Sequence, residues 1–334
     1  NDGSCTATRS PPSHWVEGED GLVGQAGLRA RAGKNSLVVI SDTDGIVIAI
    51  LTVAQLIFDP NLRRQSLGEV FVASIPDRGN VSQWVPISTV VSGLAARIEL
   101  QQAILPGDSS PAAQLRRIQS YVMCIILCGG DTVSEFPGMP THRVIDTYLE
   151  YAEYIGCLVE SDSGDPSIFS LDFDAYLRWW AIMGTLRKTP FAIRGKMGFK
   201  VNSPMADRVR VVSAVGYLDH LRDALADDPR IDSVGGNAKY NVPLEADLRC
   251  EKVRIDARYS QWSNVMAPDP NFSKRTAGLK KIDPARPLGQ WNAQSEYTDH
   301  AAVAQRAANV AAAAAAATRV LVPLAQLQAS LGDD

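Results

Sequence analysis

The stretch Ser36-Leu37-Val38-Val39-Ile40-Ser41-Asp42-Thr43-Asp44-Gly45 is an apolar run that ends in two aspartates. Its four consecutive branched residues predict a strand that is buried on both faces of a sheet. Asp42 and Asp44 follow the C-terminal end of that strand, which is the edge where open α/β sheets bind ligands. Because side chains alternate along an extended chain, Asp42 and Asp44 are expected to point the same way. Two carboxylates in that position suit a divalent cation.

A second apolar run, Tyr121 to Leu127, leads through Cys128-Gly129-Gly130 to Asp131. A third carboxylate therefore follows a buried element after two flexible glycines. We expect the two stretches to meet in space, which would place Asp131 beside Asp42 and Asp44.

Composition and charge limit the class of protein. The chain has 334 residues, of which 46% are hydrophobic and 21% charged, as in an ordinary globular protein with one large or two modest domains. A formal net charge of -4 does not indicate binding of nucleic acid through overall charge, although a local basic face remains possible. The five cysteines form no CxxC pair, so neither a zinc site nor a disulfide framework is favoured.

The sequence shows no membrane-spanning segment and no secretory signal. No apolar run reaches the roughly 18 residues that a membrane helix needs, and the first residues show no signal-peptide pattern. We therefore expect an intracellular protein, cytoplasmic or nuclear, with no membrane partner. The chain begins at Asn1 rather than at methionine, which favours a fragment or a processed product.

The pattern along the chain alternates helices and strands in the first half. Acidic residues before an apolar segment predict a helix from Trp15 to Ala32. Residues 46–58 form a second long apolar segment, which predicts either a helix or a strand that continues into a helix. The remaining expected elements are strands at 70–73 and 84–87, a helix at 88–104, a helix from Pro111 into 121–127, and a helix that follows the Pro/Gly turn at 136–140 and ends at Ile155.

The second half is expected to be mostly helical. Ser161 to Pro166 is the best linker candidate, and an apolar, Trp-rich helix is predicted from Asp172 to Leu186. Residues 227–300 look rich in turns, and Ala301 to Leu331, with seven consecutive alanines from Ala311, predicts a packing or capping helix. A basic segment lies between these parts, and both a phosphate-binding surface and an ordinary solvated face fit it; its cations are Arg187, Lys188, Arg194, Lys196, Lys200, Arg208 and Arg210.

The order of these motifs resembles one family. Gly18-Glu19-Asp20-Gly21 opens a helix, Asp42-Thr43-Asp44 follows the next strand, and Gly129-Gly130-Asp131 precedes Pro137-Gly138-Met139-Pro140. This order is similar to that of the flap-endonuclease/PIN-like 5′-nuclease superfamily, whose last motif is a helix-three-turn-helix that grips the nucleic-acid backbone. The resemblance covers roughly residues 15–155. It implies an α/β fold with a mainly parallel central sheet flanked by helices, over residues 1–160, and leaves an α-helical C-terminal region over 167–334.

The resemblance also implies roles for single residues. Glu19, Asp42, Asp44 and Asp131 would be the catalytic acids that bind Mg²⁺ or Mn²⁺, with Asp20 in place of the family's second helix acid, which falls on Gly21. The helix-three-turn-helix is expected near 136–155, with Pro140 at the position of a family glycine. The family's first strand and its aspartate would precede residue 15, so we expect an N-terminally incomplete core with weak or no activity. The residues expected to bind DNA or RNA are Gly138, Thr141, His142, Arg143, Arg187, Lys188, Arg194 and Lys196.

Two other functions remain open on sequence alone. Asp42-Thr43-Asp44-Gly45 also resembles the signature of haloacid-dehalogenase-like phosphatases, with Asp42 as nucleophile, although no lysine lies between Gly45 and Asp131. The third possibility is a PIN-like scaffold without activity that binds RNA or protein. Nucleotide-cofactor motifs such as GxGxxG and GxxxxGK[ST] are absent, so no nucleotide cofactor is expected.

Overall fold

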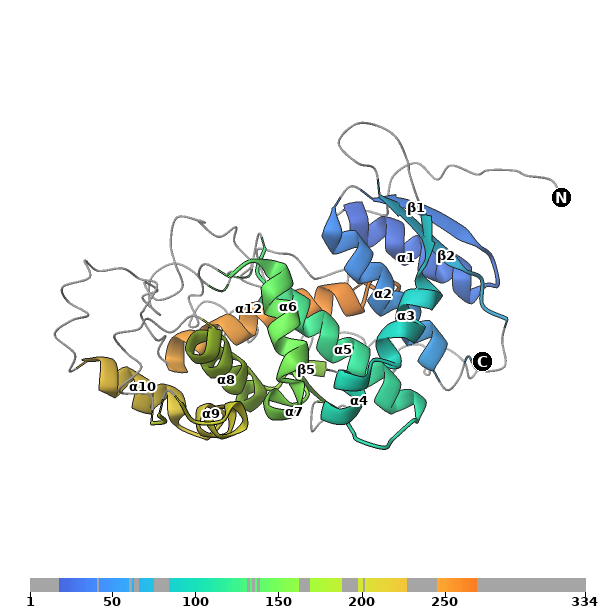
Figure 1. Ribbon diagram of the computed structural model, residues 1–334. Helices are drawn as coiled ribbons and strands as arrows, with labels where there is room; N and C mark the ends of the chain where they lie inside the picture. The colour runs from blue at the N-terminus through green and yellow to red at the C-terminus, as the bar shows by residue number, and fades with distance from the viewer. Residues whose placement is uncertain are drawn as a thin grey trace, which may run out of the picture.

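The computed structural model describes residues 18–40, 42–59, 62, 66–74, 84–130, 133, 136, 139–161, 169–187, 198–200, 202–226 and 245–268. Figure 1 shows an elongated arrangement, with the β1–β2 sheet and its helices at one end and helices α8 to α10 at the other. The long helix α12, late in the chain, runs back through the middle towards the N-terminal end.

The N-terminal end is a small mixed sheet with two helices packed on it. Strand β1 (Ser36–Ile40) pairs in parallel with β2 (Val70–Ser74), and β3 (Trp84–Pro86) pairs antiparallel with β2. The strands predicted at these three places are confirmed. Helix α1 (Gly18–Arg31) precedes β1, and helix α2 (Thr43–Phe58) connects β1 to β2.

Helix α2 begins immediately after β1 because Asp42 caps it. Asp42 has extended backbone angles, and its side chain accepts a hydrogen bond from the Asp44 N–H at 3.3 Å. The prediction that Asp42 and Asp44 alternate along an extended chain is therefore wrong, since Asp44 lies in the first helical turn. The rest of α2 is apolar on every face and is buried between neighbouring elements, as expected for a helix without a polar side.

The next segment contains three helices, α3 (Ile87–Ala95), α4 (Ile98–Ala103) and α5 (Pro111–Leu127). The single helix predicted at 88–104 is wrong, because the chain turns at Ala96-Arg97 and starts again. Helix α5 is confirmed, with Ser110 as its N-cap. The buried Arg117 of α5 donates to the carbonyls of Ile104, Leu105 and Asp108, which holds the α4–α5 connection in place.

Helix α6 (Thr141–Glu150) and helix α7 (Ala152–Ile155) follow, and then β4 (Val159–Ser161) pairs antiparallel with β5 (Phe169–Leu171). Most of the predicted linker, from residue 162, lies outside the described residues, between these two paired strands. Helix α8 (Phe173–Ile182) continues into a π-helical turn, η1 (Met183–Arg187), so the predicted Trp-rich helix is confirmed. Trp179 and Trp180 of α8 pack on Phe136.

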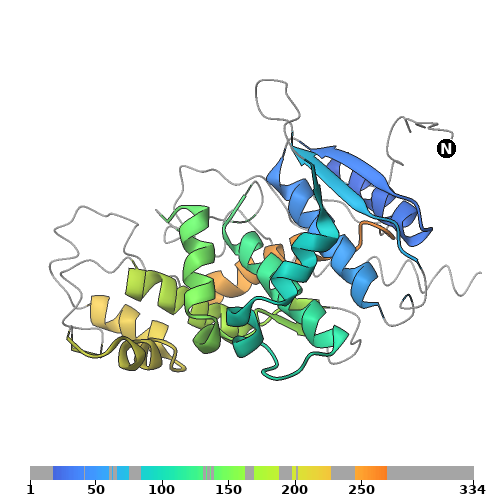
Figure 2. The same cartoon turned by 45° about the vertical axis from the view of Figure 1, so that its right-hand side comes forward.

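The C-terminal part of the described chain holds α9 (Met205–Val212), α10 (Tyr217–Ala226) and α12 (Glu245–Ser263). The turn-rich prediction is wrong for 245–263, because this stretch forms the long helix α12, which packs against α2, α5 and β5. Figure 2 shows α12 passing behind the other helices towards the sheet.

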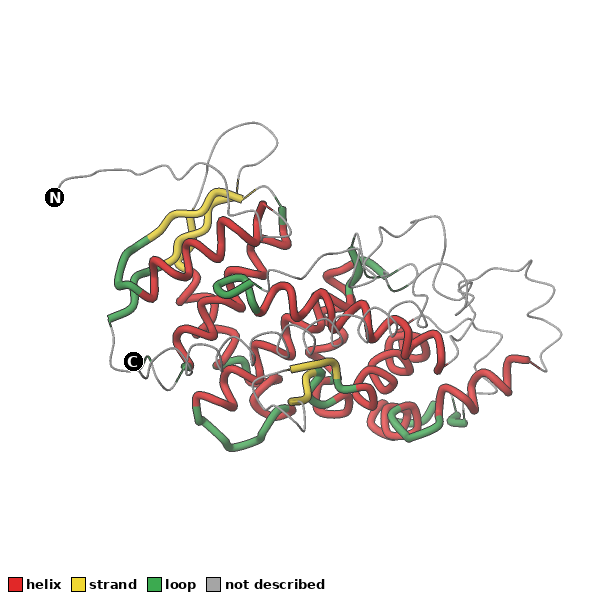
Figure 3. Tube along the Cα trace, turned by 180° about the vertical axis from the view of Figure 1, so that it is seen from behind, coloured by secondary structure: helices red, strands yellow, loops and turns green. Residues whose placement is uncertain are grey.

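The sheet has helices on one side only within the described part. Val38 and Ile40 of β1 and Val70 and Val72 of β2 are buried towards α1 and α2, whereas the alternate residues of β1 are exposed. Figure 3 shows the strands at the outer margin of the molecule, above the helices. The described sheet has three strands, two of them parallel, and the larger parallel sheet of the PIN-like fold stays a prediction.

Gly27 marks a close contact between α1 and α2 and offers a stability test. A Cβ on Gly27 of α1 would lie 2.7 Å from Thr52 Cγ2 of α2 and 2.9 Å from Met266 Sδ. We expect Gly27→Ala to lower the free energy of unfolding by about 1–2 kcal/mol, because the helices must separate. Urea denaturation of the full chain measures the change.

Gly93 is the matched control, because it lies in α3 and a Cβ there would meet nothing within 4 Å. Gly93→Ala is expected to raise the stability by about 0.5–1 kcal/mol through helix propensity. Equal effects of the two substitutions would contradict the close packing of α1 on α2.

Candidate functional site

Three of the predicted acids come together where α1 and α2 begin. Glu19 and Asp20 lie in the first turn of α1, and Asp44 lies in the first turn of α2, next to the end of β1. The two helix ends approach closely, since a Cβ on Gly45 would lie 2.6 Å from Ile40 Cγ2 and 3.3 Å from Glu19 Cγ. Only glycine fits at this position without displacing Ile40. The glycine after the second aspartate therefore allows Glu19 to lie beside the start of α2.

Helix α12 brings an arginine to these acids. Arg258 Nη2 donates to Asp44 Oδ2 at 2.6 Å, and the Arg258 side chain is 7% exposed whereas that of Asp44 is 40% exposed. Arg258 Nη1 also donates to Gln261 Oε1 at 3.3 Å, and its guanidinium lies 4.8 Å from the centre of the Trp262 ring. The guanidinium is thus oriented by a carboxylate, an amide and an aromatic face.

Asp20 is the most buried acid of the group, with 2% of its surface exposed. Its Oδ2 accepts a hydrogen bond from Gln261 Nε2 at 2.7 Å, while its buried Oδ1 has no hydrogen-bond partner within the described structure. Burial raises the pKa of Asp20 to about 6, and the negative charges of Glu19 and Asp44 add to this effect. The hydrogen bond from Gln261 and the positive charge of Arg258 act in the opposite direction. The three acids and Arg258 therefore form one electrostatic unit, which we call the acid cluster.

The other two predicted acids differ in position. Asp42 is exposed and caps α2 at the same end, whereas Asp131 lies outside the described residues, directly after Gly130 at the end of α5. Within the described ranges, no three His, Cys, Asp or Glu side chains are arranged to hold a metal ion. The donor chemistry nevertheless suits a hard cation, because the cluster offers carboxylate oxygens and the unpaired Oδ1 of Asp20.

The predicted nucleic-acid-binding residues are only partly described. Thr141, His142 and Arg143 are exposed in the first turn of α6, directly after Pro140. A helix N-terminus with exposed first-turn residues is a favourable place for a phosphate. Gly138, Lys188, Arg194, Lys196 and the side chain of Arg187 lie outside the described residues.

Arg258 and Gln261 are the residues that the sequence analysis missed. The signal that could have indicated them is the spacing of Leu248, Ile255, Tyr259 and Trp262, all buried, which is the spacing of one helix face, in a stretch without glycine or proline. The many charged residues of α12 obscured this pattern, because charged side chains are ordinarily expected on a solvated surface. Several of those in α12 instead form ion pairs within the fold.

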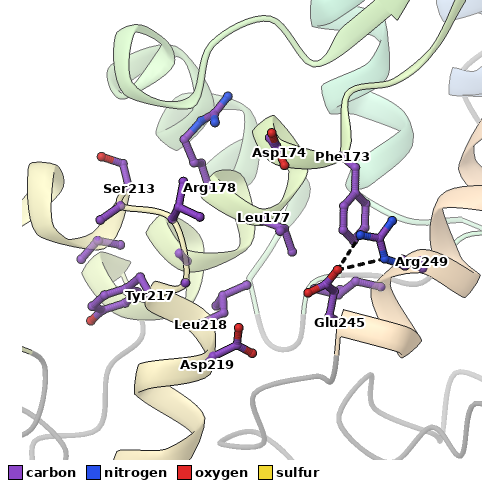
Figure 4. A pocket seen from close by; sticks show the side chains of 16 residues that line it. Phe173, Asp174, Leu177, Arg178, Ser213, Tyr217, Leu218, Asp219, Glu245 and Arg249 are labelled. Carbon is purple, nitrogen blue, oxygen red and sulfur yellow. Dashed lines mark hydrogen bonds and ion pairs between the residues drawn. The ribbon is translucent and has the colours of Figure 1, made fainter.

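A cavity of about 220 Å³ lies elsewhere, between α8, the start of α10 and the start of α12. Figure 4 shows Phe173 and Leu177 on one side of it and Tyr217 and Leu218 on the other. Some of the charged residues that line the cavity interact with one another. Arg249 forms an ion pair with Glu245 at 2.6 Å, and its guanidinium lies 4.2 Å from the centre of the Phe173 ring. None of the acids predicted from the sequence lines this cavity.

Comparisons with protein-family models, with curated proteins and with solved structures found no match for this chain. None of the helices in the described ranges combines the length and the apolar character that crossing a membrane requires.

The raised pKa of Asp20 predicts how stability changes with pH. Because the pKa is about 6 in the folded protein and ordinarily 3.8, the folded state holds this proton more tightly than the unfolded state does. The resulting stabilisation is complete below pH 3.8 and is lost as the pH rises through 6. Between pH 4 and 7.5 we expect the free energy of unfolding of the wild type to fall by roughly 2–3 kcal/mol relative to that of Asp20→Asn. The asparagine still accepts the hydrogen bond from Gln261 but carries no charge.

Urea denaturation of both proteins across this pH range, with chelator present, measures the difference. A stability difference that stays constant with pH would show that Asp20 titrates as an ordinary exposed carboxyl.

Proposed function

We propose that this protein is a metal-dependent nuclease that hydrolyses phosphodiester bonds of DNA or RNA. The observation that carries the proposal is the acid cluster, in which Glu19 and Asp20 from α1 lie beside Asp44 at the end of β1, with the buried Oδ1 of Asp20 left without a hydrogen bond. The resemblance to PIN-like 5′-nucleases implies metal-binding roles for Glu19 and Asp44, with Asp20 in place of the family's second helix acid. Clustered carboxylates from separate elements are also what hydrolysis of a phosphodiester through hard cations requires.

Each residue has a distinct role in this proposal. Glu19, Asp20, Asp42, Asp44 and Asp131 hold Mg²⁺ or Mn²⁺, which supplies a bound water of lowered pKa and neutralises charge on the phosphate. Thr141, His142 and Arg143 bind the nucleic-acid backbone at the start of α6, together with Gly138. The basic residues Arg187, Lys188, Arg194 and Lys196 bind further phosphates.

Arg258 competes with the metal for Asp44. Its guanidinium already donates to Asp44 Oδ2 at 2.6 Å, so a cation that binds this oxygen must displace or share the arginine. Arg258 also brings a positive charge close to where the metal binds, and like charges repel. The affinity of the wild type for a divalent cation is therefore lower than the carboxylates alone would give.

The same ion pair favours a second candidate function, the PIN-like scaffold without activity. An acid that is neutralised inside the protein by a buried arginine has no need of a metal, and Gln261 likewise binds Asp20. In that case the fold is used to bind RNA or protein through other surfaces. The nuclease and the scaffold predict opposite results for metal binding.

The proposal is tested by metal binding and cleavage with the full chain. Calorimetry with Mn²⁺ is expected to show weak binding to wild type and binding about tenfold tighter to Arg258→Met, which corresponds to about 1.4 kcal/mol of removed competition. Asp44→Asn is expected to abolish both Mn²⁺ binding and cleavage of labelled single-stranded or flapped DNA and of RNA. Circular dichroism checks that each variant is folded.

Glu153→Gln is the matched control, because Glu153 is an exposed carboxylate of α7 outside the acid cluster. It removes the same charge and is expected to leave metal binding and cleavage unchanged. Retention of Mn²⁺ binding and cleavage by Asp44→Asn would overturn the proposal. A wild type and an Arg258→Met variant that both bind nucleic acid but no metal would establish the scaffold, and phosphate release from p-nitrophenyl phosphate that is lost in Asp42→Asn would establish the phosphatase.

A further inference from the structure

The outer face of the three-stranded sheet is apolar and exposed. Leu37 and Val39 of β1 are 59% and 41% exposed, and Trp84 of β3 is 62% exposed. The register places Leu37 beside the half-buried Phe71 and places Val39, Ala73 and Trp84 in one row across the strands, in which Ala73 itself is buried between its larger neighbours. The Phe71 and Trp84 rings meet edge to face at 4.9 Å, so these residues form a continuous apolar surface, which we call the outer sheet face.

The outer sheet face differs from the solvent-exposed face of an ordinary sheet that packs helices on only one side. Such a sheet carries polar residues on its solvated side, whereas the outer sheet face has Leu, Val, Phe, Ala and Trp at its successive positions. The composition of β1 is that of a strand buried on both faces, and only one face is covered by the described helices. A second covering layer is therefore expected on the outer side.

The described chain ends next to this sheet. After α12, Ser263 O accepts a hydrogen bond from Gln55 Nε2 of α2 at 3.0 Å, and Met266 packs beside Gly27 of α1. Helices α1 and α2 cover the inner side of β1 and β2. Residues 269–334 follow, and the stretch 269–300 alone reaches roughly 100 Å when extended, which is ample to pass around the edge of the sheet.

The last part of the sequence has the composition of a covering helix. Residues 301–322 are rich in alanine, a strong helix former, and lie before Pro323. As a helix they span roughly 33 Å, longer than the strands that they would cover. On a helix, Val303, Ala307, Val310, Ala314, Ala317 and Leu321 would share one side, because they are spaced by four and three residues; alanines fill most of the other positions as well, so we define this stripe by its two valines and its leucine. Gln305 and Arg319 fall on the opposite side.

We propose that residues 301–322 form a helix that packs its stripe on the outer sheet face of the same chain. The small alanines allow the helix to approach the sheet, and the large side chains of Leu37, Phe71 and Trp84 fill the space between them. The packing removes from water the apolar surface that the described helices leave exposed. The proposal is independent of the acid cluster, which lies at the C-terminal edge of β1 on the covered side.

Photo-crosslinking from position 84 tests the contact in the full chain. With Trp84→p-benzoylphenylalanine, irradiation at low protein concentration is expected to give a cross-link within one chain, mapped by mass spectrometry to residues 301–322. Val215→p-benzoylphenylalanine, at a position that is 99% exposed outside the sheet, is expected to give no such cross-link.

Two alanine substitutions show whether the stripe makes the contact. Ala314→Asp places a charge in the stripe and is expected to lower the cross-link yield at least about tenfold, because an unpaired carboxylate is costly to bury. Ala312→Asp places the same charge on the opposite side of the helix and is expected to leave the yield within about twofold.

Equal yields for the two variants, or a cross-link from position 84 that maps outside residues 301–322, would overturn the proposal. Cross-links that join two chains would show that a second copy covers the face, and would overturn it as well.

Discussion

The burial of α2 along most of its length is the constraint on which the rest of this structure depends. Its residues from Val47 to Ala54 are buried without interruption, so α1, α3, α5 and α12 must surround it. A helix with no polar side can carry charge only at its ends. Asp42 and Asp44 therefore lie at its first turn, where the helix dipole stabilises negative charge, and this is also the end of β1. The position of the acid cluster follows from packing before any function is considered.

Helix α12 completes the enclosure of α2 with charged side chains that are paired. Arg254 forms an ion pair with Glu251 at 3.6 Å, with both side chains 1% exposed, and Arg258 pairs with Asp44. Asp256 accepts a hydrogen bond from the Leu171 N–H at 2.7 Å, which ties α12 to β5. Because a buried charge without a partner is costly, these pairs permit few orientations of α12 against the remainder of the fold. The site therefore depends on a helix that is distant in sequence.

The sequence was informative where one local pattern determined the structure. The run Leu37 to Ile40 predicted β1, and Pro111 before an apolar segment predicted the start of α5. Residues 46–58 were ambiguous because a segment that is apolar at almost every position has no clear period that separates helix from strand. The contact of Arg258 with Asp44 could not be predicted, since 214 positions separate the two residues and no local sequence pattern indicates the pairing. The gathering of Glu19 with Asp44 was expected only from the resemblance to PIN-like nucleases.

The balance of charge in the acid cluster connects its structure to its two candidate functions. With Asp20 ionised, Glu19, Asp20 and Asp44 contribute three negative charges, and Arg258 is the cation that lowers the pKa of Asp20. That pKa remains at about 6, so the arginine does not fully compensate for burial and for the neighbouring acids. A proton or a second cation can relieve the remaining repulsion. At pH 7 the proton is largely absent, which leaves the cluster in the state in which the proposed divalent cation would gain most from binding.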